Sequence, residues 1–92
     1  MNINVGKAII HNRKSVTSSA AALGSSTELR YGLQLIAEGT NSAAVYVGNS
    51  SVSTGNGFPL DPSGSLFIPI DNLSTAYAVS STGTQFVRFI GA

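Results

Sequence analysis

The chain of 92 residues contains no cysteine, no tryptophan, one histidine and few charged side chains. Without cysteine it has no disulfide, no zinc thiolate site and no cysteine nucleophile. Charged residues make up 10% of the chain, against about 25% in an average soluble domain, and the net charge is +1. The dense basic region that neutralises phosphates is therefore missing, and we expect no nucleic-acid partner.

Long apolar runs are missing as well. No apolar stretch approaches the about 20 residues of a membrane-spanning helix, and the start MNINVGKAII lacks the apolar core of a secretory signal. We expect no membrane partner. A single domain of this size buries a small core, so self-association or docking on a larger partner is the expected supplement to its stability.

The residues that usually carry catalysis or bind metal are sparse and dispersed. No serine lies in a G-x-S-x-G motif, and Gly55-Asn56-Gly57 lacks the lysine and the helix of a phosphate loop. No zinc or calcium ligand spacing occurs among the single histidine and the four carboxylates: His11, Glu28, Glu38, Asp61 and Asp71. The sequence therefore predicts no enzyme, no cofactor and no metal site.

Apolar residues recur with period two, which predicts strands at 29–37, 43–48, 65–71, 75–81 and 84–92. In the first of these, the inward face is expected to carry Leu29, Tyr31, Leu33, Leu35 and Ala37. Residues 19–23 are interpreted as a short strand or a turn. Turn signals separate the strands about every ten residues, which is typical of an all-β antiparallel sandwich, either jelly-roll-like or immunoglobulin-like.

The later strands carry two further signals. Pro69 cannot donate to a strand ladder, so we expect residues 65–71 to form an edge strand or to carry a bulge. Thr82-Gly83 favours a tight hairpin between the last two strands.

The last strand, 84–92, has apolar side chains on both faces. Phe86 and Ile90 alternate with Val87 and Phe89. We expect one face of this strand to pack in the core and the other to meet a neighbouring chain.

Residues 1–14 stand apart from the domain predicted at 15–92, and two interpretations stay open. They form either a first strand or an arm that lies on a neighbour. The segment holds three of the five cations and the only histidine. In the second interpretation, the contacts with a partner come from Ile3, Val5, Lys7, Ile9, Ile10, Arg13 and Lys14.

The stretch VYVGNSSVSTGNGFPLDP, residues 45–62, contains a polar loop at 48–57. We interpret it as a hydroxyl-rich connection, after which residues 58–60 return to the core. The alternative is a glycan-binding or host-adhesion module that uses this loop together with Tyr31, Tyr46 and Tyr77.

Residues 36–79 resemble small virion proteins of tailed bacteriophages. The succession of motifs carries the resemblance, best at Tyr46-Val47-Gly48 and at residues 57–60, then at Asp71, Leu73 and Tyr77. Two departures are the Ser63-Gly64 that follows Pro62, where such proteins often have Pro-Gly directly, and residues 1–14, which have no counterpart.

The resemblance implies a non-enzymatic β-sandwich component of a phage particle, of the capsid decoration or cement type. Its expected place is the capsid surface, after synthesis in the cytoplasm of the host bacterium. Its expected partners are the major capsid protein and further copies of itself, with a trimer favoured. A neck, tail or fibre-base component is the alternative within the particle.

Overall fold

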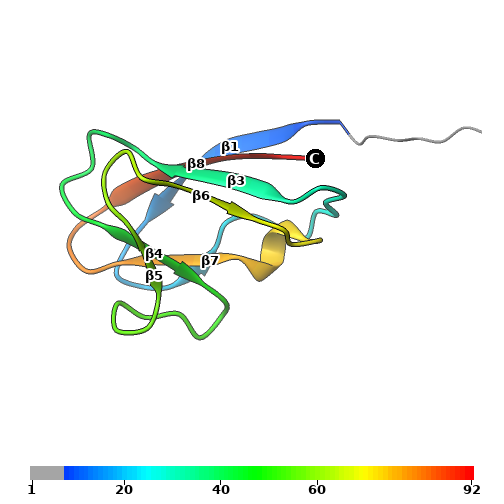
Figure 1. Cartoon of the computed structure of the whole chain (residues 1–92). Helices are drawn as coiled ribbons and strands as arrows, with labels where there is room; N and C mark the ends of the chain where they lie inside the picture. The colour runs from blue at the N-terminus through cyan, green and yellow to red at the C-terminus, as the bar shows by residue number, and fades with distance from the viewer. Residues whose placement is uncertain (1–7) are drawn as a thin grey trace, which may run out of the picture.

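The computed structural model describes residues 8–92, and its regular secondary structure consists of β-strands except for one short 3-10 helix (Figure 1). The elements are β1 Ile10–Val16, β2 Ala21–Ala22, β3 Leu33–Ala37, β4 Val45–Gly48, β5 Phe58–Leu60, β6 Ser65–Ile68, the 3-10 helix η1 Leu73–Thr75, β7 Tyr77–Ser80 and β8 Gln85–Gly91. They form two antiparallel four-stranded sheets, sheet A in the order β1-β8-β3-β6 and sheet B in the order β2-β7-β4-β5. The expected all-β sandwich is confirmed.

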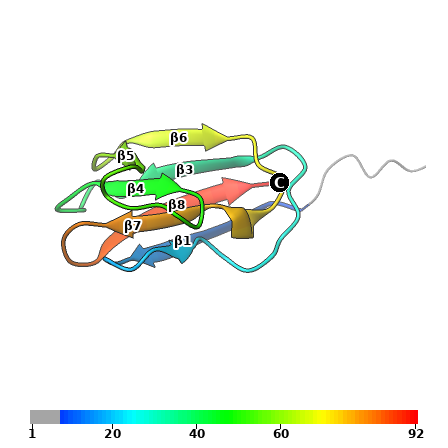
Figure 2. The same ribbon diagram turned by 90° about the horizontal axis from the view of Figure 1, so that it is seen from below.

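The strand pairs are nested along the chain. β4 pairs with β5, β3 with β6, β2 with β7 and β1 with β8. Eight strands folded in this way into two sheets form a jelly roll, the first of the two expected sandwich types. Figure 2 shows the order of sheet A across the molecule, from β6 through β3 and β8 to β1.

The core lies between the two sheets and follows the period-two pattern. In β3 the buried residues alternate with exposed ones, and β4 and β8 follow the same alternation. Leu33, Leu35, Val45 and Val87 are among the largest fully buried side chains. Burial of apolar surface contributes about 25 cal/mol per Å² and is the main favourable term that holds the sheets together.

The expected inward position of Tyr31 is wrong. Strand β3 begins only at Leu33, because Gly32 has a φ of 108°, a backbone conformation that takes the chain out of the strand. Leu29 is buried as expected, but Tyr31 is 59% exposed. A glycine within an alternating run was the signal for this break.

The expected hairpin at Thr82-Gly83 is also wrong. β7 belongs to sheet B and β8 to sheet A, so these residues cross between sheets. The Ser80 hydroxyl donates to the carbonyl of Gly83 at 2.9 Å, and the Gln85 side-chain amide donates to the carbonyl of Thr82 at 2.7 Å. These side-chain hydrogen bonds stabilise the connection between the sheets, although its local sequence also suits a hairpin.

The expected edge position of the Pro69 strand is confirmed, because β6 is an outer strand of sheet A and ends at Ile68. The segment 19–23 contributes the short strand β2. Residues 10–14 belong to β1, which continues to Val16, so the boundary placed between residues 14 and 15 lies inside a strand.

Candidate interaction surfaces

The loop between β4 and β5 is the connection of the innermost hairpin, and its polar groups bond to one another. The side chain of Asn49 accepts from the backbone N–H of Ser51 at 2.9 Å, and that of Asn56 accepts from Ser53 at 2.8 Å. Val52 within the loop is buried. These hydrogen bonds are made within the loop and hold it in an ordered conformation, in agreement with its interpretation as a connection. The return segment differs from expectation, because Leu60 is buried but Phe58 is exposed.

The tyrosines do not gather on one platform. Tyr46 lies opposite Val79 and Tyr77 lies opposite Gly48, so both belong to the outward face of sheet B. Tyr31 lies in the segment that leads into sheet A, where its N–H donates to the carbonyl of Ala92. The structure therefore brings two of the three residues together.

The outer face of sheet A, the upper side of the molecule in Figure 1, carries an apolar patch. Ile36 from β3, Phe67 from β6 and Ile90 from β8 are 43%, 53% and 48% exposed. Gln34 lies between Phe67 and Ile90, because it pairs with both. The sequence shows these residues on the outward phase of three separate strands, and only the strand order joins them into one surface.

An ion cluster bounds this patch on the side of β1. The carboxylate of Glu38 accepts from Arg13 Nε at 2.5 Å and from Arg88 Nε at 2.8 Å. The Arg13 guanidinium also lies 3.7 Å from the centre of the Phe86 ring. Hydrogen bonds from Arg13 and then Arg88 lower the pKa of Glu38 from 4.5 to about 2. The cluster joins β1, β8 and the end of β3.

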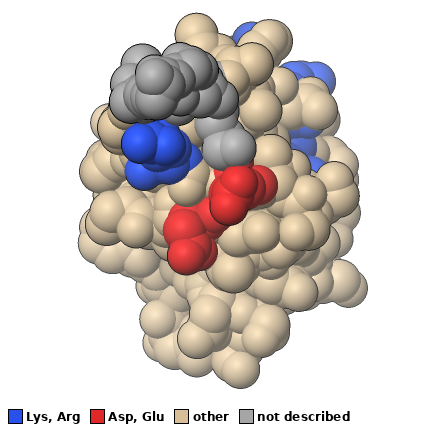
Figure 3. Space-filling view, turned by 90° about the vertical axis from the view of Figure 1, so that its right-hand side faces the viewer, with Lys and Arg blue, Asp and Glu red and all other residues tan. Residues whose placement is uncertain are grey.

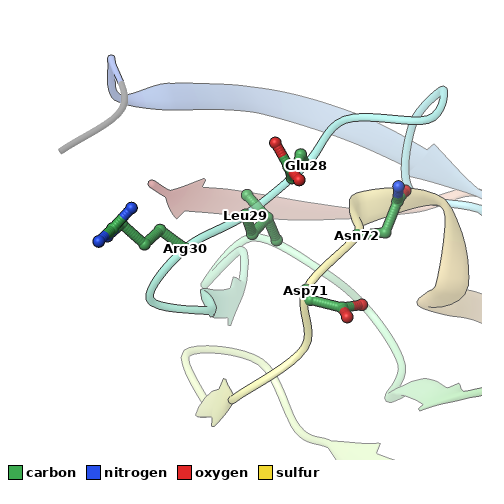
Figure 4. A pocket seen from close by; sticks show the side chains of 5 residues that line it. All are labelled: Glu28, Leu29, Arg30, Asp71 and Asn72. Carbon is green, nitrogen blue, oxygen red and sulfur yellow. The ribbon is translucent and has the colours of Figure 1, made fainter. Parts of the chain in front are cut away.

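The end of the sandwich where β1 starts carries a polar pocket of about 450 Å³, lined by Glu28, Leu29, Arg30, Asp71 and Asn72. We call this region the terminal end. Figure 3 faces it and shows acidic side chains side by side on a largely uncharged surface. In Figure 4 the carboxylates of Glu28 and Asp71 point in different directions and Arg30 points away from both. The lining residues therefore do not converge on a common centre.

A second, apolar cleft opens between the two sheets on the side where β5 and β6 are the edge strands. It has a volume of about 320 Å³ and is lined largely by aliphatic and aromatic side chains from β4, β5 and β6 and from the segment around η1. Phe58 pairs with the inward residue Val47 and so points inward, but within residues 8–92 no strand lies beyond β6 to cover it. This geometry explains why an inward-phased phenylalanine stays exposed.

The structure divides the predicted partner-contact residues into three groups. Ile3, Val5 and Lys7 lie outside the described residues. Ile9 is 65% exposed beside the start of β1, whereas Ile10 packs against the core.

Two of the three cations of the set, Arg13 and Lys14, lie within β1. Arg13 is held by Glu38 on the outward face. Lys14 is half-buried opposite the inward residue Val87. Ile10 and Arg13 therefore contribute to the domain itself, and their contact with a partner stays a prediction.

No protein family, curated protein or solved structure matches this chain. Within residues 8–92, no three side chains of the histidine, aspartate and glutamate type gather where they could share a metal ion. Over the same part of the chain, no helix has the length and apolar character to cross a membrane.

Proposed function

We propose that this chain is a non-enzymatic structural component of a tailed-phage particle, a capsid decoration or cement protein that binds where capsid subunits meet. The resemblance over residues 36–79 supports the context, and this segment runs from β3 to β7. Jelly rolls occur in viral capsid domains and also in lectins, so the fold agrees with this context without establishing it.

The observation that carries the proposal is the exposure of large apolar side chains at the terminal end of a chain with few charges. Ile9 and Tyr31 are both exposed there, on either side of the chain end at Ala92. Buried against a shell, such side chains contribute about 25 cal/mol per Å², less the costs of association. Repetition over a particle makes weak contacts collectively strong.

We therefore orient the protein with its terminal end toward the shell. Residues 1–7 continue the chain from this end, so Ile3, Val5 and Lys7 remain predicted contacts with the major capsid protein. Of the described members of this set, Ile9 and Arg13 are exposed, and Ile9 lies at the terminal end. A homo-oligomer on the capsid surface, with a trimer favoured, remains a prediction.

Copy number in purified particles tests the function. Quantitative mass spectrometry is expected to find the protein in a high, capsid-like copy number. A low copy number would favour the neck, tail or fibre base, and absence from particles would refute the proposal.

Variants at the terminal end test the orientation. Ile9→Asp and Tyr31→Asp place a charge in the proposed interface, so we expect lower occupancy on particles that lack the native copy. Phe58→Asp on β5 is the control, because its side chain is 55% exposed on a different surface. Deletion of residues 1–8 leaves β1 intact and is expected to reduce occupancy. Unchanged occupancy in all three test proteins would refute the orientation.

A further inference from the structure

We propose that Asn56-Gly57, in the loop between β4 and β5, is a site of spontaneous deamidation whose rate is set by opening of this loop. Asn56 is the only asparagine of the chain that glycine follows. Glycine has no Cβ, so its backbone nitrogen approaches a neighbouring side chain with little steric hindrance. Asn56 is exposed to the water that the reaction consumes. The inference does not depend on the particle proposal.

The reaction takes place within the chain and needs only water. The backbone nitrogen of Gly57 loses its proton and attacks the side-chain carbonyl carbon, Cγ, of Asn56. A carbon–nitrogen bond forms, the bond from Cγ to Nδ2 breaks, and Nδ2 leaves with the proton as ammonia. Water then opens the resulting cyclic imide at either carbonyl. One product is aspartate, and the other is isoaspartate, in which the main chain runs through the former side chain.

The packing of the loop explains why glycine stands at position 57. A Cβ there would lie 2.7 Å from Tyr46 Cβ and 2.7 Å from Val52 Cγ2, closer than packed carbon atoms approach. The side chain of Val52 is 8% exposed, so it has little room to move away. The fold therefore requires a glycine immediately after Asn56.

In the folded loop, hydrogen bonds hold both reacting groups. The N–H of Gly57 donates to the carbonyl of Ser53 at 2.8 Å, which stabilises the protonated nitrogen and opposes loss of its proton. The side chain of Asn56 accepts from the N–H of Ser53 at 2.8 Å and donates to the carbonyl of Ser51 at 3.4 Å, which fixes its direction. The attack therefore requires that the loop opens first, as hydrogen exchange of a bonded amide does.

Opening of the loop breaks these hydrogen bonds and removes the packing of Val52. We therefore expect the folded protein to deamidate at Asn56 about 10- to 100-fold more slowly than the unfolded chain.

The two products differ in their effect on the fold. Aspartate keeps an oxygen that accepts from the N–H of Ser53. Isoaspartate adds one carbon to the main chain just before β5, in which Phe58 pairs with Val47 and Leu60 is buried. The longer connection no longer matches this register. We expect isoaspartate to loosen the edge strand β5 and aspartate to leave it in place.

Peptide mass spectrometry after incubation at mildly alkaline pH measures the rate at Asn56, in buffer and in guanidinium chloride above the unfolding midpoint. Val52→Ala loosens the loop and is expected to raise the rate in buffer several-fold. Thr54→Ala is the matched control, because Thr54 is exposed in the same loop. In guanidinium chloride the parent and both variants are expected to react equally fast, since only the folded loop distinguishes them.

Ion exchange separates the aged forms, and urea unfolding measures their stability. The isoaspartate form is expected to unfold at a lower urea concentration than Asn56→Asp, which supplies the aspartate product. Equal rates for the folded and unfolded parent protein, or a faster reaction at another asparagine of the unfolded chain, would overturn the proposal. So would equal rates of Val52→Ala and Thr54→Ala in buffer, and equal stability of the two products would overturn the effect on β5.

Discussion

Gln85 is a buried polar side chain that links the loop before β4 to the turn between β7 and β8. Its replacement by methionine is the sharpest test of the fold. Its side chain oxygen accepts from the N–H groups of Ser42 and Ala43 at 2.9 and 3.3 Å. Its amide nitrogen donates to the carbonyl of Thr82 at 2.7 Å and to the hydroxyl of Ser42 at 3.1 Å. Gln85 is 2% exposed, so water does not reach it in the folded protein.

Gln85→Met keeps the length of the side chain and removes all four bonds. At about 1 kcal/mol per bond, with partial recovery by water at the exposed Ser42 and Thr82, we expect a loss of about 2–4 kcal/mol. This is a large part of the roughly 5–14 kcal/mol available to a chain of this size. The melting temperature is expected to fall by roughly 10–25 °C.

Urea unfolding followed by circular dichroism measures the loss, provided that the slope of the transition is unchanged. Ser42→Ala is the control, because it removes only the hydroxyl bond to Gln85 and is expected to cost less than about 1 kcal/mol. A loss below about 1 kcal/mol for Gln85→Met, or equal losses for both variants, would refute the reasoning.

Three further substitutions test separate contacts. Glu38→Gln is expected to lower the free energy of unfolding at pH 7. Folding lowers the pKa of Glu38 from 4.5 to about 2, so the stability difference between parent and variant should be complete above pH 4.5 and disappear as the pH falls toward 2. A difference in urea midpoint that does not change with pH would contradict this prediction. Gly32→Ala is expected to cost about 2–4 kcal/mol in thermal unfolding, since φ is positive and the new Cβ lies 2.7 Å from the carbonyl oxygen of Ile68, whereas Gly55→Ala, with its nearest atom at 3.7 Å, should be nearly neutral. Asn72 is the N-cap of η1, and its side chain oxygen accepts from the N–H groups of Thr27 and Ser74. Asn72→Ala removes this oxygen, so we expect a loss of about 1–2 kcal/mol by urea unfolding, and an unchanged stability would refute the role of this cap.

The local sequence determines the strands and their inward phase. Alternation of apolar and polar residues predicts that Leu33, Leu35 and Ala37 lie in the core, and all three do. The reason is geometric, because successive side chains of a strand point to opposite faces and only one face can be buried. The edge position of the Pro69 strand was predictable for a similarly local reason, the missing N–H.

The pairing of strands is a long-range property, and the sequence left it open. Only β4 and β5 form a hairpin between consecutive strands, while β1 pairs with β8 from the other end of the chain. The turn at Thr82-Gly83 suits a hairpin locally, yet β7 pairs with β2 and β4 and β8 pairs with β1 and β3, so the two strands lie in different sheets. The inward-phased Phe58 is exposed for a related reason, since only the sheet order shows where cover ends.

The sequence by itself determined that this is an all-β sandwich with few charges and no recognisable catalytic motif. Only the tertiary structure decided which outward residues share a surface. Ile36, Phe67 and Ile90 are far apart in the chain, and the registers of β3, β6 and β8 bring them together. The physical reason is that composition and period fix the burial of each strand, whereas an interaction surface depends on which strands are neighbours.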